Sequence, residues 1–119
     1  MIYYYCKKIN RRFIIQFKKA FLRLYVLGYL YRQDSYGYDL VNEVSRNSLV
    51  PEGNIYPLLR QLRNEGFVST YLKESPEGPP RRYYRITDSG RNEKENLQKQ
   101  WFSFTKKFNK LLLNGEKNE

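Results

Sequence analysis

Side chains suited to contacts with nucleic acid recur on two neighbouring segments. On residues 54–66 they are Asn54, Tyr56, Arg60 and Arg63. On residues 81–87 they are Arg81, Arg82 and Tyr83. An asparagine amide can pair with an adenine edge, and an arginine can bind a guanine edge or a phosphate. A tyrosine can reach a phosphate or a thymine methyl, so the residue types indicate contact with DNA.

Two of these assignments have ordinary structural alternatives. Asparagine is a common helix cap, so Asn54 can serve folding instead of base recognition. Arg81 and Arg82 suit phosphate contact or minor-groove insertion, but they can equally be the solvated end of a strand. The sequence leaves both alternatives open.

The composition excludes several kinds of catalytic and metal site. The chain has no histidine and a single cysteine, Cys6, which rules out ordinary zinc sites and Ser-His or Cys-His pairs. Its carboxylates show no cluster suited to acid–base catalysis. These carboxylates include Glu65, Glu74, Asp88 and Glu93. We therefore expect neither an enzyme nor a cofactor, and the lack of an internal disulfide favours the cytoplasm.

Positive charge is concentrated before residue 34. The formal net charge is +10, and eight of the 22 Lys and Arg residues precede Asp34, whereas none of the 12 acidic residues does. A basic arm on a nearly neutral body indicates a polyanionic partner. The longest uncharged run, Leu24 to Tyr31, is too short to span a bilayer.

Other functions explain less of the chain. A membrane-surface protein could use the basic, aromatic N-terminus as an interfacial helix, but this accounts only for residues 1–33. An RNA-binding module is disfavoured because no RNP-like or KH glycine signature is present. The basic face can also serve solubility alone.

Apolar periodicity predicts three helices before residue 66. The first spans residues 13–31, and its apolar face is Phe17, Phe21, Leu24, Val26, Leu27 and Leu30. The second spans about residues 36–46 and buries Leu40, Val41 and Val44, with Asp34 or Ser35 as its N-cap. The third buries Ile55, Leu58, Leu59 and Leu62. It begins either at Asn54, with Pro57 in the first turn, or at Pro51 or Glu52. Gly66 is expected to end it.

Two strands and a long helix are expected next. The strands are residues 67–74 and 81–87, joined by a stiff tip, Ser75 to Pro80, whose Gly-Pro-Pro cannot join a sheet ladder. The helix runs from Asp88 to about Leu113. Along it Leu97, Trp101, Phe104, Phe108 and Leu111 follow spacings of 4, 3, 4 and 3. This heptad pattern favours a dimer interface over packing on the chain's own core.

The predicted fold class is α+β, mainly helical with a small β-hairpin: a winged helix-turn-helix followed by a dimerisation helix. Its expected parts are a basic arm (1–12), a DNA-binding domain (13–87), the dimerisation helix (88–113) and a flexible tail (114–119).

Three groups of residues resemble the PadR family of winged-helix transcriptional regulators. They are Tyr36-Gly37-Tyr38-Asp39-Leu40, Glu52 to Arg60 with Leu62 and Glu65-Gly66, and Glu77 to Thr87 with Gly90. The similarity covers about residues 17–113. Pro51, where the family has serine, and Asn54, where it has threonine, depart from the pattern and bear on capping and operator preference.

The resemblance implies a homodimer whose third helices enter successive major grooves of double-stranded DNA, with the wings near phosphates and the minor groove. It also implies repression relieved by an effector. Since some family members bind flat aromatic compounds between subunits, Trp101, Phe104, Phe17 and Phe21 are candidate effector-binding residues. Trp101 has a simpler alternative as a hydrophobic residue of the interface.

Overall fold

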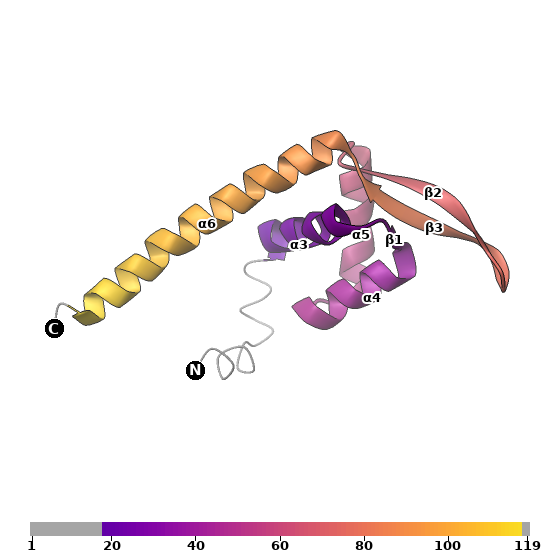
Figure 1. The fold of residues 1–119 in the computed structure, drawn as a ribbon. Helices are drawn as coiled ribbons and strands as arrows, with labels where there is room; N and C mark the ends of the chain where they lie inside the picture. Colours follow the sequence, from indigo (N-terminus) through magenta and orange to yellow (C-terminus); the bar gives the residue numbers. More distant parts are fainter. Residues whose placement is uncertain (1–17, 118–119) are drawn as a thin grey trace.

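The computed structural model describes residues 18–117 as four helices and a three-stranded antiparallel sheet (Figure 1). The elements are α3 (Lys18–Arg32), β1 (Ser35–Tyr36), α4 (Gly37–Ser48), α5 (Glu52–Asn64), β2 (Val68–Ser75), β3 (Gly78–Ile86) and α6 (Asp88–Lys117). The α+β class is confirmed. The predicted arm (1–12) and Phe17 lie outside the described residues.

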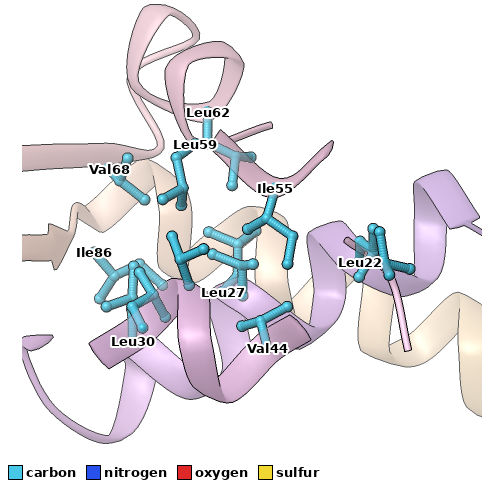
Figure 2. Close-up of a cluster of buried hydrophobic side chains, with 13 residues drawn as sticks. Leu22, Leu27, Leu30, Val44, Ile55, Leu59, Leu62, Val68 and Ile86 are labelled. Carbon is cyan, nitrogen blue, oxygen red and sulfur yellow. The ribbon is translucent and has the colours of Figure 1, made fainter. Parts of the chain in front are cut away.

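The core lies where α3, α4 and α5 meet the base of the sheet (Figure 2). The apolar faces predicted for α4 and α5 are confirmed, with Leu58 only partly buried. On α3 the sequence missed Leu22, which is buried, whereas Phe21 only packs against the core edge. The fully assembled core is Leu22, Val26, Leu27, Leu30, Leu40, Val41, Val44, Val50, Ile55, Leu59, Leu62, Val68 and Ile86.

The predicted cap of α4 is wrong. Tyr36 occupies the N-cap position, and no side chain caps the helix. The preceding residues instead form β1, in which Ser35 pairs with Tyr84 and Tyr36 with Tyr83 of β3. Pairing to a strand nearly fifty residues away in sequence, rather than a local cap, therefore sets the start of α4.

Helix α5 takes the earlier of its two predicted starts. Its N-cap is Pro51, without a side-chain cap bond, and the backbone N–H of Asn54 donates to the Pro51 carbonyl at 2.9 Å. Pro57 therefore lies in the second turn, where it cannot donate to the carbonyl of Gly53. Both residues are exposed, which leaves that carbonyl open to solvent.

The C-terminus of α5 is a Schellman motif, as the glycine predicted. Gly66 has φ +82°, its N–H donates to the Arg63 carbonyl at 3.0 Å, and the Phe67 N–H donates to the Leu62 carbonyl at 2.9 Å. This geometry favours glycine and turns the chain into β2.

The hairpin β2–β3 extends beyond the helices (Figure 1). Strand β2 has the predicted length but is shifted by one residue, whereas β3 is longer than predicted because it already begins at Gly78, which pairs with Ser75. Pro79 and Pro80 thus lie within a strand, contrary to the prediction. They are accommodated by the irregular register between Lys73 and Ser75, and β1 does not reach this part of β3. Prolines are tolerated at such edges.

Helix α6 is fixed tightly at its first turn. The hydroxyl of Thr87 accepts the Gly90 N–H at 3.0 Å, the bond expected of an N-cap. A Cβ on Gly90 would lie 2.0 Å from the Phe67 carbonyl oxygen, so any side chain there would force α6 off the sheet. The helix continues to Lys117, four residues beyond its predicted end and into the segment expected to be a flexible tail.

Candidate nucleic-acid interface

Helix α5 has one buried side and one open side. Ile55, Leu59 and Leu62 anchor it, and the four predicted contact residues are all exposed. Tyr56 is 42% exposed although it is a large aromatic residue. Within residues 18–117 none of the four side chains makes a hydrogen bond or ion pair. The open side is therefore free to contact a ligand.

The four residues divide between two flanks of α5. Tyr56, Arg60 and Arg63 follow spacings of four and three, so they share one flank. At ~100° per residue, Asn54 lies ~160° around the helix from Tyr56. Gln61, which is also exposed, shares Asn54's flank through its i+7 spacing. The sequence carried this signal, but the prediction did not include Gln61.

Arg23 of α3 links the end of α5 to its neighbours. Its guanidinium donates to the Glu65 carboxylate at 2.9 Å, just beyond the end of α5, and lies 3.8 Å from Glu93 of α6. The same group lies over the Phe67 ring, 5.8 Å from its centre. One arginine thus joins three helices at the junction with β2.

The wing arginines lie on opposite faces of β3. Arg82 donates to the Thr70 hydroxyl at 3.1 Å and shares the face that reaches the core at Ile86. Arg81 lies on the outer face over the Tyr36 ring, 4.8 Å from its centre. The predicted pair therefore points in two directions.

Tyr83 belongs to a stack of rings on the outer face. Its ring centre lies 5.7 Å from that of Tyr71 and 6.0 Å from that of Tyr36. Lys73 lies over Tyr83 at 5.0 Å and Arg85 over Tyr71 at 4.8 Å. Tyr83 thus packs under a cation rather than reaching outward as a contact residue. The sequence analysis missed this surface because it depends on the pairing of three strands.

The predicted interface residues of α6 behave in two ways. Leu97 packs against the core, and Trp101 is half-buried with its ring centre 6.3 Å from that of Phe21 on α3. Phe104, Phe108 and Leu111 are 50%, 48% and 69% exposed. Part of the stripe therefore packs within the subunit, and the remainder is uncovered.

Two hollows flank Trp101 between α3 and α6. The larger, of about 450 Å³, also includes Tyr25, Tyr29 and Phe102, and the smaller, of about 310 Å³, includes Leu97 and Phe104. Leu24 and Trp101 contribute to both, whereas Phe21 lines neither. Of the predicted effector-binding residues, Trp101 and Phe104 line the smaller hollow together, and Phe21 lies edge-on to Trp101 outside both hollows.

Within residues 18–117, no group of three or more His, Cys, Asp or Glu side chains is placed to hold a metal ion. None of the helices in this range is both long and apolar enough to cross a membrane.

Known proteins share this fold. The PadR-like transcriptional regulator of Bacillus cereus superposes with a TM-score of 0.74 at 34% identity, covering 82% of this chain and 96% of its own. A PadR family regulator of Eggerthella lenta gives 0.69 at 29%, covering 83% and 88%. A transcriptional regulator of Mycobacterium tuberculosis is 32% identical over 77 residues, which are 64% of this chain and 71% of that protein.

The three-stranded sheet, the exposed helix α5 and the projecting hairpin define a winged helix-turn-helix protein that binds DNA. The model of the PadR-like transcriptional regulator family matches residues 26–96. The chain belongs to this family, whose members are transcriptional regulators and not enzymes.

Proposed function

We propose that the protein is a repressor that binds a pseudo-palindromic operator as a homodimer. The observation that carries this proposal is the free outer side of α5, which presents Arg60 and Arg63 beside a cationic hairpin. In a twofold dimer the two copies of α5 read inverted half-sites, about one helical turn (~34 Å) apart. Occupation of such an operator would block transcription.

The uncovered stripe of α6 supports the dimer. Phe104 and Phe108 stack on each other, with ring centres 5.7 Å apart, yet about half of each side chain is exposed. Leu111 continues the stripe. A second copy would cover it, since exposed contiguous apolar surface usually marks an interface. The alternative of packing on the same core accounts for Leu97 and Trp101 only.

Selection of binding sites from random duplexes tests the function. We expect an enriched inverted repeat, bound about 10³-fold or more tighter than a scrambled duplex at physiological salt. Recovery of no motif, with equal affinity for heparin and for all duplexes, would contradict a sequence-specific regulator.

The wing arginines are expected to contribute affinity without sequence preference. Replacing Arg81 and Arg82 by alanine removes phosphate contacts, and each lost contact lowers the slope of log K against log salt by about 0.9. Because a dimer carries two wings, the double variant should lose about four units of slope if both residues bind phosphate. Fluorescence anisotropy at several salt concentrations measures this.

The single variants decide which face of β3 meets DNA, because Arg81 and Arg82 point oppositely. Lys99→Ala, which removes an exposed cation from α6, is the control and should retain the wild-type slope. Unchanged slopes in both wing variants would rule out a role for the wing.

A flat aromatic effector is proposed to bind beside Trp101 and to alter the dimer. The two hollows between α3 and α6 support this site, since their linings are mainly apolar. Trp101 is the only tryptophan, so its emission reports binding directly. We expect saturable quenching by some member of a panel of planar aromatic compounds. Leu24→Ala, which enlarges both hollows, should change the affinity, whereas emission indifferent to every compound would exclude the site.

A further inference from the structure

Asp34 has a role that capping does not explain. It is the first acidic residue of the chain and lies between α3 and β1, where no side chain caps α4. Its Oδ2 accepts one hydrogen bond from the Tyr71 hydroxyl at 2.8 Å and another from Arg85 Nε at 3.1 Å. Tyr71 belongs to β2 and Arg85 to β3, so a single carboxylate joins both strands of the wing to the helical body.

On the inner face of the wing, Tyr84 also packs against the core. Val68 and Ile86 bury the base of the hairpin, whereas Leu72, four residues further along β2, is 63% exposed. Strand β1 pairs with β3 only at Tyr83 and Tyr84. Beyond Tyr84 the inner face is exposed at Leu72 and Arg82, so the angle of the wing there depends on the outer face, where Asp34 is attached.

The ring stack extends this attachment along the hairpin. From the Tyr71 held by Asp34, the stack continues through Tyr83 to Tyr36 of β1. Arg85, Lys73 and Arg81 each lie over one of these rings. Because the outer-face cations pack on these rings, a change in the orientation of Tyr71 would also change theirs.

Charge makes the position of Asp34 informative. The three cations of this face attract phosphate, but the negative charge of Asp34 repels it and so weakens that attraction. Its ion pair with Arg85 is partly exposed, and such pairs add little to global stability. Neither electrostatic attraction of DNA nor overall stability therefore explains the residue, whereas orientation of the wing does.

We propose that Asp34 is a positioning residue that fixes the angle of the wing relative to α5. The role rests on the proposed DNA-binding function. With the wing held, its arginines and the side chains of α5 can engage one duplex together, without ordering the hairpin on binding.

The protonation of Tyr71 is consistent with this role. Its hydrogen bond to the Asp34 carboxylate raises the pKa of the Tyr71 hydroxyl above its ordinary value of 10.0, and burial and the negative charge of Asp34 raise it further. The group is therefore a donor throughout the neutral range. Because the pKa of Tyr71 is raised in the folded state, this hydrogen bond contributes to stability below pH 10. The contribution is lost only as the pH rises through the folded-state pKa.

The test compares Asp34→Ala in two backgrounds, the wild type and the Arg81→Ala, Arg82→Ala variant. We expect operator affinity to fall about tenfold in the first and to change little in the second, because positioning matters only if the wing makes contacts. Amide hydrogen exchange should accelerate in β2 and β3 but not in α5. Tyr71→Phe should reproduce part of the loss.

Glu74→Ala is the matched control. It also removes an exposed acidic group from the wing and should leave DNA binding unchanged or tighten it. Affinity retained in Asp34→Ala, or lost equally in both backgrounds, would overturn the positioning role. Failure of the wild type itself to bind any duplex would instead refute the proposed function.

Discussion

Phe108→Glu is expected to convert the protein into folded monomers and to weaken operator binding at least ~100-fold. The subunit should remain folded, because Phe108 is about half exposed and its ring, among residues 18–113, stacks on that of Phe104 alone. In the proposed dimer, however, the substitution places two carboxylates in the apolar contact between copies of α6. Burying an unpaired charge costs several kcal/mol, so the substitution strongly disfavours this contact.

The effect on DNA follows from the loss of the second reading helix. A dimer that has bound one half-site holds its other α5 near the next at a millimolar effective concentration. A monomer lacks this gain and should bind the full operator no better than an isolated half-site. Light scattering at the working concentration, together with anisotropy on both duplexes, measures the two consequences separately.

Asn109→Glu provides the control for charge on α6. The residue is adjacent and exposed, but it lies outside the predicted heptad positions, so the variant should remain dimeric. A Phe108→Glu protein that still scatters as a dimer would show that the subunits associate through another surface.

Features set by neighbouring residues were predictable from the sequence. The apolar faces of α4 and α5 follow from 3.6-residue periodicity, and the end of α5 follows from the need for a positive φ at Gly66. The start of α5 was ambiguous, because Pro51 and Asn54 both suit the beginning of a helix. The structure resolves the ambiguity in favour of Pro51.

Features set by distant residues were not predictable. Strand β1 has two residues and exists only because β3 lies beside it. The same pairing displaces Asp34 from its expected cap toward Tyr71. Along α6 the heptad spacing places five apolar residues on one face, but only the packing of α3 shows that Trp101 is partly covered whereas Phe108 is not.

Asn54→Ala is expected to change which operator the protein prefers without lowering its stability. Asn54 is exposed, and the N-cap of α5 is Pro51, so its side chain is not needed to cap the helix. Its position in the first turn suits a bidentate contact with adenine, worth about 1–3 kcal/mol of discrimination. Since a dimer contains the residue twice, discrimination at the two symmetric positions should fall by ~30-fold or more.

Repeating the site selection with the variant measures this effect, and thermal unfolding measures stability. Asn64→Ala is the matched control: it removes the same exposed amide from the last turn of α5, far from the end that reads bases, and should return the wild-type motif. If Asn54→Ala also returned that motif but melted at a lower temperature, the side chain would serve folding. Another exposed residue of α5 would then have to read the bases. Gln61 is the first candidate, because it shares the flank of Asn54.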